Sequence, residues 1–322
     1  MPPTIKRRHL IACTALWPLL ASAAWPTRPL RIIVPGGPGG VIDIRARWIA
    51  QRIAAPLGQA VVVDNRPGAG GNVGTEAGAR SEPDGHTLTL IHQGTMTVNP
   101  HLYARPGYDA LADFTPVARL GLGPLLLAVH PALPSTSPAE LIEHAKAKPG
   151  QLNFGSPGIG TPPHLAVELF KRAAQIDVVH VPYKGGGQAA ADLVAGHVQF
   201  AIESLNVLLP HVQAGRLRAL ATTGPRRVAA LSGVPTIAES GWPQCEFIGW
   251  TGLGVPAATP PAIVERLYQV IHTVLDSSEA REWFGAIGAE PGDVGPEEFA
   301  RYIRAEHAKW GQVIREAGIR LE

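Results

Sequence analysis

The spacing of apolar residues near the start of the chain predicts a strand, a glycine-rich turn and a helix. An apolar run at 32–34 meets Pro35, and glycines then dominate the turn at 36–40. Beyond the turn, apolar residues recur over 42–53 at the three- and four-residue spacing of one helical face. Such a helix directs its unpaired N–H groups and the positive end of its dipole into the turn, where glycines leave the backbone open. This pattern favours a cradle for an anion.

A second stretch of the same kind occupies 153–171, where a short apolar strand leads through a Gly/Ser/Thr turn into a helix. Two such turns that face each other would hold one small anion between them. Taken singly, each turn also fits a tight strand-to-helix connection in which the glycines serve only the turn. The first turn lacks the Lys and Ser/Thr of a Walker loop, and its glycine spacing differs from that of a dinucleotide fingerprint.

The rest of the chain alternates between short apolar runs and helical patterns. We expect strands at 61–63, 87–91, 125–129, 178–181, 198–202, 217–221 and 249–255, and helices at 75–80, 138–149, 188–195, 207–214 and from 260 and 296. This alternation on short loops is typical of α/β domains with mostly parallel sheets, which bind ligands beyond the carboxyl ends of their strands. The last helix carries one apolar face, so we expect it to pack on the first domain.

These elements predict two α/β lobes joined by two crossing strands, with a ligand cleft between the lobes. We expect 25–123 and 225–322 to form a first, discontinuous lobe, and 124–224 to form the second lobe as an insertion. The last helix would then cover the first lobe after the chain has returned to it.

The first residues have the organisation of an export signal. Three basic residues at 6–8 precede the apolar segment 10–20, and small residues at 22–24 form a cleavage site. We expect the cut after Ala24, with Ala23 as the near alternative. The apolar segment is too short to span a bilayer. Cys13 lies too early in that segment for a lipoprotein box. We therefore expect a periplasmic protein.

Charge and cysteine content narrow the class of protein further. The 322-residue chain has 28 Lys and Arg against 26 Asp and Glu, and removal of the signal takes away three basic residues and no acidic one. The mature chain then has 25 basic residues against 26 acidic ones, which argues against nucleic-acid binding or docking on an anionic membrane surface. Only Cys245 remains after cleavage, so no internal disulfide can form.

Two patterns raise the alternative of an enzyme. The stretch Gly155–Gly158 is similar to a nucleophile elbow around Ser156, but that motif needs a glycine two residues before the serine, where Phe154 stands. His164 and Glu168 lie one helical turn apart and could ligate a metal, but no third ligand follows at a suitable spacing. We therefore expect neither catalysis nor a bound metal or cofactor.

Several segments, taken in order, resemble those of the periplasmic solute-binding proteins of the tripartite tricarboxylate transporter family, known as TctC or Bug proteins. The resemblance is carried by RPLRIIVPGGPGGVIDIRAR, VVVDNRPGAGGNVG, NPHLY, DFTPVARL, LNFGSPGIGTPPHLAVELF, VVHVPYKGGGQAAADLVAGHV and AGRLRALATT. It extends over nearly the whole mature chain. The family fold is a type II periplasmic binding protein, which agrees with the two lobes expected above.

The resemblance implies that a carboxylate is held between 36–40 and 156–161 by backbone amides, small hydroxyls and ordered waters. The ligand-binding residues expected on this basis are Gly36, Gly37, Pro38, Gly39, Gly40, Asp43, Gln93, Gly94, Thr95, Ser156, Gly158, Gly160, Thr161, His164, Tyr183 and Glu203. Asp43 would either accept a hydrogen bond from the ligand or close the turn and pair with Arg47. His164 would orient its loop or donate to the ligand. Neither loop contains Arg or Lys, so helix ends and waters would neutralise the carboxylate.

The chain departs from its relatives at positions that would set selectivity. Gly36 and Gly37 replace the aromatic residue and Ala of many relatives, and 92–96 keeps only the Gly-Thr pair. Glu203-Ser204 stands where relatives often have Asp-Asn. The resemblance therefore leaves the particular carboxylate open.

The function predicted by this resemblance is that of an extracytoplasmic receptor that delivers a small organic anion to the membrane subunits of a tripartite tricarboxylate-type transporter. A receptor that carries the same ligand but docks on a membrane sensor kinase is the alternative from another class. The expected partners are the carboxylate and those membrane proteins, with no nucleic acid, and the expected state is a monomer.

Overall fold

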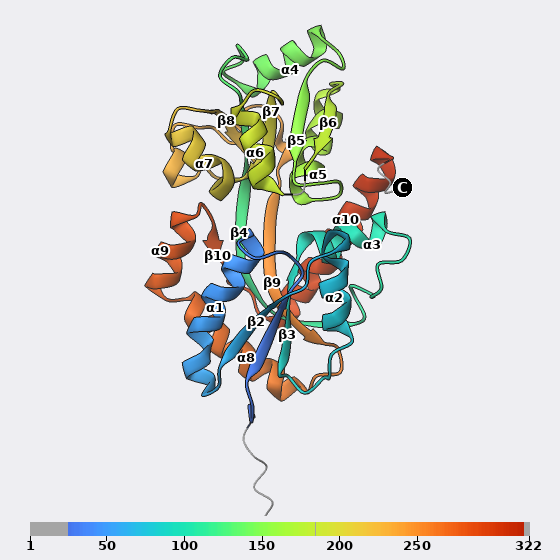
Figure 1. Cartoon of the computed structure of the whole chain (residues 1–322), viewed down its shortest axis with the longest axis vertical. Coiled ribbons are helices and arrows are strands. Elements are labelled where there is room, and N and C mark those ends of the chain that lie inside the picture. The colour runs from blue at the N-terminus through green and yellow to red at the C-terminus, as the bar shows by residue number, and fades with distance from the viewer. Residues whose placement is uncertain (1–24, 184, 319–322) are drawn as a thin grey trace, which may run out of the picture.

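The computed structural model describes residues 25–183 and 185–318 and consists of two α/β lobes connected by two long strands (Figure 1). In Figure 1 the first lobe lies at the bottom and the second at the top. The signal peptide predicted at 1–24 lies outside the described residues. The arrangement confirms the fold class expected from the sequence.

The first lobe is built on a mixed sheet. Its strands are β1 (Leu30–Val34), β2 (Val61–Asn65), β3 (Thr87–His92), the first part of β4 (Phe114–Val129), β9 (Ile248–Pro256) and β10 (Glu290–Pro291). β1 pairs in parallel with both β2 and β3, so the carboxyl ends of these three strands meet at one edge of the sheet. That edge faces the second lobe (Figure 1), and the glycine-rich turn after β1 begins there.

Helices cover both faces of this sheet. They are α1 (Val41–Leu57), the 3₁₀ turn η1 (Ala69–Gly71), α2 (Asn72–Ala79), the π-helical turn η2 (Gly94–Val98), α3 (Asn99–Leu102), α8 (Pro261–Leu275), α9 (Ser278–Ala286) and α10 (Pro296–Ala317). α1 begins directly after Gly40 and buries Ile49 and Ile53 against the sheet and α8, which is the apolar stripe that the sequence predicts.

The second lobe repeats the α/β design. It contains the second part of β4, β5 (Asn153–Ser156), β6 (Val179–Pro182), β7 (Phe200–Ser204), β8 (Arg218–Thr222), α4 (Pro138–Ala147), α5 (Pro162–Ala174), α6 (Gly186–Val194), α7 (Leu205–Gln213) and the 3₁₀ turns η3 (Ala229–Leu231) and η4 (Pro243–Cys245). β5 pairs in parallel with β6 and β7, while β4 runs antiparallel to β7 and β8. Phe154, Phe170 and Phe200 are fully buried in its core.

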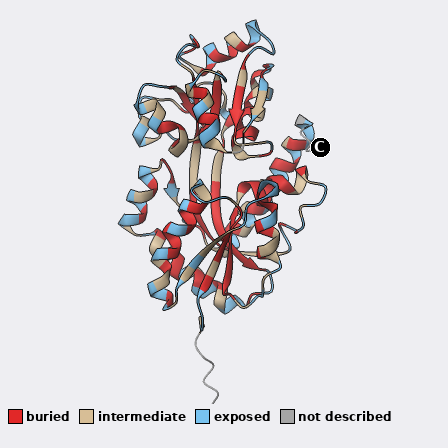
Figure 2. Ribbon diagram, in the orientation of Figure 1, coloured by how far each residue is buried: buried red, intermediate tan, exposed pale blue. Residues whose placement is uncertain are grey.

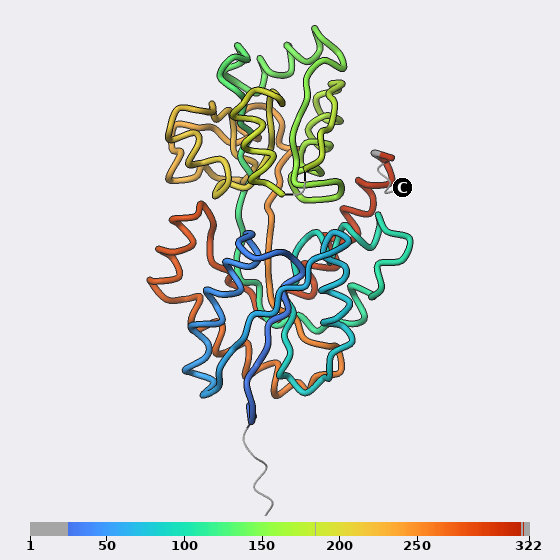
Figure 3. Tube along the Cα trace, viewed as in Figure 1, coloured from blue at the N-terminus to red at the C-terminus, as the bar shows by residue number. Residues whose placement is uncertain are grey.

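Two antiparallel strands carry the chain between the lobes. β4 pairs with β9 as far as Pro124, and from Leu125 it pairs with β7 of the second lobe. The trace in Figure 3 shows the chain leaving the first lobe along β4 and returning along β9. Residues 122–124 of β4 are only half-buried (Figure 2), because they lie between the two cores.

The segment between β8 and β9 packs on the second lobe. The Ile237 amide donates to the Thr222 carbonyl (2.7 Å), and the Phe247 amide donates to the Thr223 carbonyl (2.9 Å). Ile237 and Phe247 are buried in the second-lobe core together with Cys245. The lobe boundary expected at residue 225 stays a prediction. These contacts favour a chain that remains on the second lobe after residue 225 and returns to the first lobe only along β9.

The C-terminal helix α10 contacts both lobes. It packs on η2 and β4, as expected for a first-lobe helix. Its later residues also contact the second lobe. Trp310 packs against Phe247, and Glu316 forms an ion pair with Arg172 of α5 (2.8 Å). α10 therefore joins the lobes on the side away from α9 (Figure 1).

Candidate functional site

A cavity of about 670 Å³ lies between the two lobes, at the level of the crossing strands. Its lining residues come from 39–45, 92 and 287–289 of the first lobe, from 157–163, 186–190 and 203–211 of the second, and from 123–125 and 249–251 of the crossing strands. Both lobes therefore contribute to one cleft, and the two glycine-rich turns enter it from opposite sides.

The turn after β1 is held in place by Asp43, which is buried at the start of α1. Asp43 Oδ2 accepts hydrogen bonds from the Gly39 amide (2.8 Å) and from Arg47 Nε (3.0 Å), and Oδ1 accepts one from Asn65 Nδ2 (2.9 Å). Burial opposes the charge on Asp43, but these hydrogen bonds outweigh it and lower the pKa of the carboxyl. Because both oxygens are engaged, the geometry supports the turn-closing role for Asp43.

Within the turn, Gly39 and Gly40 line the cavity, whereas Gly36, Gly37 and Pro38 lie outside its lining. Gly39 has a φ of 78°, which glycine adopts without strain. A Cβ placed on Gly39 would meet no atom within 4 Å. The turn therefore leaves space for an approaching anion at Gly39, although the Gly39 amide itself is bound to Asp43.

The turn after β5 is held by hydrogen bonds from beneath. The Ser156 hydroxyl lies 2.6 Å from His180 Nε2, and its oxygen accepts from the Gly158 amide (3.2 Å). The Thr161 hydroxyl donates to the Gly158 carbonyl (2.7 Å). Thr161 and Pro157 line the cavity, while Ser156 and Gly158 lie behind it and shape the turn.

Two histidines support this second turn as neutral rings. His164 Nδ1 accepts a hydrogen bond from the Gly160 amide (3.2 Å), and its ring stacks on that of His180 at 4.2 Å. Burial lowers the pKa of His164 to about 3 and that of His180 to about 4. The orienting role expected for His164 fits this geometry, and neither His164 nor Gly160 lines the cavity.

Four helices begin at the cavity: α1 and, from the second lobe, α5, α6 and α7. The residue before each helix makes no side-chain hydrogen bond to the helix N-terminus. These four residues are Gly40, Thr161, Gly185 and Ser204. The first residues of each helix line the cavity, so open N–H groups and positive dipole ends from both lobes meet there. α5 contributes fewer donors, because Pro162 and Pro163 have no N–H. This convergence favours an anion.

Three expected site residues follow β3, and Gln93, Gly94 and Thr95 all lie outside the lining of the cavity. The Gln93 side-chain amide donates to Glu306 of α10 (3.2 Å). The Gly94 amide donates to Nδ1 of His92 (3.1 Å). His92, which the sequence places in the segment 92–96 expected to set selectivity, lines the cavity, and burial lowers its pKa to about 4.

The last two expected residues differ in placement. Tyr183 lies outside the lining and donates its hydroxyl proton to Asp192 (2.7 Å). Glu203 lines the cavity with only 3% of its surface exposed. Its Oε1 accepts from the Ser204 amide (2.6 Å), and its Oε2 has no hydrogen-bond partner in the described part of the chain. Burial raises the pKa of Glu203 to about 7, although the bonds to Ser204 oppose the shift.

Sequence reasoning missed a buried cation on the cavity wall. Arg45 of α1 lines the cavity with 7% of its surface exposed, and its Nη1 donates to the Thr251 hydroxyl of β9 (2.9 Å). Trp250, beside Thr251, also lines the cavity, and its buried Nε1 lacks a partner among the described residues. Arg45 follows Ile42 by three residues and precedes Ile49 by four, so a charge on the apolar stripe is the signal that could have revealed it.

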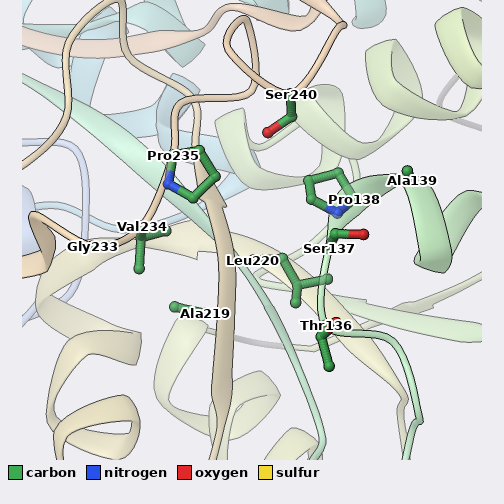
Figure 4. A pocket seen from close by; sticks show the side chains of 10 residues that line it. All are labelled: Thr136, Ser137, Pro138, Ala139, Ala219, Leu220, Gly233, Val234, Pro235 and Ser240. Carbon is green, nitrogen blue, oxygen red and sulfur yellow. The ribbon is translucent and has the colours of Figure 1, made fainter.

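A smaller cavity of about 270 Å³ lies in the second lobe, among the start of α4, β8 and the segment before Ser240 (Figure 4). Figure 4 shows Pro235 and Pro138 on opposite sides of it. Its hydroxyls are engaged, since Ser240 donates to the Thr236 carbonyl and Ser137 Oγ accepts from the Glu140 amide. No charged side chain lines it. This cavity offers an organic anion no counter-charge.

Other classes of site find little support in residues 25–183 and 185–318. No group of three or more His, Cys, Asp or Glu side chains in this part is arranged to hold a metal ion. No helix there is long and apolar enough to cross a membrane. Ser156 and His180 are hydrogen-bonded, but in this part of the chain no carboxylate contacts His180 to complete a catalytic triad.

Comparison with known proteins finds a family whose model matches most of the chain. Residues 45–319 match the family described as the tripartite tricarboxylate transporter family receptor. Protein BugT of Bordetella pertussis is 37% identical over 313 residues, which cover 97% of this chain and 96% of BugT.

Two solved structures are similar over their full length. Rpa4515 of R. palustris, solved with adipate, is 39% identical with a TM-score of 0.86, over 92% of this chain and 100% of that one. MatC from Rhodopseudomonas palustris, solved with bound malate, is 31% identical with a TM-score of 0.82, over 90% of this chain and 100% of that one.

Proposed function

The chain belongs to the tripartite tricarboxylate transporter receptor family, and from this premise we propose that it is an extracytoplasmic receptor for a small carboxylate. It binds the carboxylate in the cleft between the lobes and delivers it to the membrane subunits of a transporter of that type. The structures of relatives with adipate and with malate support a carboxylate as the ligand.

The convergence of four uncapped helix N-termini on one cavity carries this proposal. α1 belongs to the first lobe and α5, α6 and α7 belong to the second, so an anion at this point gains contacts to both lobes only when they are close together. A ligand with this differential affinity shifts the population towards the closed form. The closed form is then the state that the membrane subunits recognise.

Binding without catalysis is the role that this site supports. The serine that resembles a nucleophile is fully buried, and its hydroxyl is used to hold the second turn through Gly158 and His180. Membership in a receptor family points the same way. Export through cleavage after Ala24 and a monomeric state stay predictions, and nothing in the described residues favours docking on a sensor kinase.

Calorimetric titration of the mature protein, refolded from denaturant to remove any carried ligand, tests the proposal. The probes are adipate, malate and simple monocarboxylates. We expect Gly39→Val to weaken the binding of any carboxylate that the wild type binds by roughly tenfold or more, since a side chain here is strained and fills the cradle.

Gly215→Val is the matched control for this variant. Gly215 also has a positive φ (68°) and open space around it, but it lies outside the cleft, after α7. Gly215→Val should lose stability as Gly39→Val does, because both variants place valine at a positive φ, but it should bind the carboxylate with wild-type affinity. A wild type that binds none of the probes, or equal affinity losses in the two variants, would contradict the proposal.

A further inference from the structure

We propose that Arg45 is a second anion-binding residue of the cleft, and that the ligand is a dicarboxylate whose far carboxylate pairs with its guanidinium. This inference rests on the proposed function, since it assigns the other end of a ligand whose first carboxylate lies at the helix N-termini. On this basis Arg45 is the residue that gives dicarboxylates a higher affinity than monocarboxylates.

The guanidinium of Arg45 is buried without a counter-charge. Among residues 25–183 and 185–318, no carboxylate lies within salt-bridge distance of it. Its Nη1 is bound to a neutral hydroxyl on Thr251, and its Nε is buried with no hydrogen-bond partner. A buried cation of this kind is strongly destabilising unless something pairs with it. An anionic ligand group would supply the missing partner.

The surroundings leave the guanidinium open on the cavity side. A Cβ placed on Gly123 of β4 would lie 3.6 Å from Arg45 Nη2, so the absence of a side chain at Gly123 leaves space next to this nitrogen. On another side the guanidinium lies 5.7 Å from the centre of the Phe284 ring. Arg45 is therefore positioned by one hydroxyl and one ring, with donors left over for a carboxylate, which a planar guanidinium can bind with two hydrogen bonds.

Arg45 lies further along α1 than the glycine-rich turn, so it offers the cleft an anion contact at a distance from that turn. It follows Gly40 by five residues, which is about 7.5 Å along a helix axis. Because helical side chains lean towards the N-terminus, the guanidinium extends back towards the cleft and reaches β9. A ligand held at the turn by one carboxylate would thus extend its second carboxylate along the cleft floor to Arg45.

The acidic residue of the cleft does not serve as this partner. Glu203 also lines the cavity, but on the second lobe, and no salt bridge joins it to Arg45. Burial and its bonds to Ser204 account for the raised pKa of Glu203, with no cation among the causes. The counter-charge for Arg45 must therefore come from outside the described chain.

Calorimetric titration with two matched ligand series tests the inference. The dicarboxylates run from succinate to suberate, and the monocarboxylates run from butyrate to octanoate. We expect the wild type to prefer the dicarboxylate at the best chain length. Arg45→Met should lower that affinity by roughly 10- to 150-fold, since a charged hydrogen-bonded contact is lost, and should leave the affinity for the matching monocarboxylate unchanged. Arg45→Lys keeps the charge and should lose less.

Arg52→Met controls for the loss of one positive charge from α1. Arg52 pairs with Glu279 and covers Trp48 outside the cavity, so this variant should bind both series as the wild type does. If Arg45→Met keeps its dicarboxylate affinity, or loses affinity for both series equally, Arg45 is structural and the inference is wrong. If the wild type binds both series equally, the inference fails while the proposed function stands. If it binds neither, the proposed function fails as well.

Discussion

Glu203 should make the stability of the ligand-free protein fall as the pH rises, and Glu203→Gln should remove this dependence. Burial raises the pKa of Glu203 from 4.5 to about 7 in the folded chain. Between those values the folded protein keeps a proton that the unfolded chain releases, so the unfolding free energy decreases with increasing pH. The loss begins near the unfolded pKa and is complete above the folded one.

The size of the effect follows from the shift. One pKa unit corresponds to ~1.4 kcal/mol, so the ionised carboxylate costs ~3 kcal/mol of stability at high pH. Gln keeps an oxygen that can accept the Ser204 amide and carries no charge. The difference in unfolding free energy between Glu203→Gln and the wild type should therefore be about 2–3 kcal/mol larger, in favour of the variant, near pH 8 than near pH 5.

Urea unfolding of the mature, ligand-stripped protein at the two pH values measures this difference. Glu143→Gln makes the same chemical change at an exposed position on α4 of the same lobe, and it should show no pH-dependent gain. A gain for Glu203→Gln that is equal at both pH values would show that the buried carboxyl does not titrate as described, and the reasoning would be refuted.

Two further predictions concern the turns. The pKa values of His164 and His180 are lowered in the folded chain to about 3 and about 4. Their contribution to the unfolding free energy should therefore be lost as the pH falls below 6.5, the pKa of an unfolded histidine. In urea unfolding between about pH 7 and about pH 5, His180→Gln should reduce this dependence of the unfolding free energy on pH. Because Glu203 acts in the opposite direction over this range, the test is the difference between the two proteins, and equal slopes for His180→Gln and the wild type would contradict the prediction. Asp43→Ala should lower stability by roughly 1–3 kcal/mol and weaken carboxylate binding, because the turn at Gly39 loses its anchor. Unchanged affinity in calorimetric titration would mean that the turn is held without Asp43.

The sequence predicts the strand–turn–helix units and the crossing strand β9 well, and the crossing strand β4 poorly. Patterns at 32–34 and 42–53 became β1 and α1, because each element buries one apolar face of its own. β4 was predicted only at 125–129, yet it begins at Phe114. Its first part contains prolines and glycines that suggest a loop, and pairing with β9 overrides this preference.

The candidate site shows a similar division. Backbone features of the turns could be predicted, since Gly39, Gly40 and Thr161 follow from local glycine and helix-start patterns. Side chains brought in from a distance could not, because Thr251 on β9 reaches the cavity only through the pairing of β9 with β3. Asp43, Ser156 and His164, by contrast, hold the turns through hydrogen bonds without lining the cavity.

A carboxylate should bind between the lobes, at the helix N-termini. A crystal structure of the mature protein with the dicarboxylate that binds best is the sharpest test of this site. One carboxylate should lie against the backbone of Gly39, Gly40 and Thr161, and the other on the guanidinium of Arg45. A ligand bound outside the interlobe cavity, or bound within it without touching either turn, would show that the site is wrongly assigned.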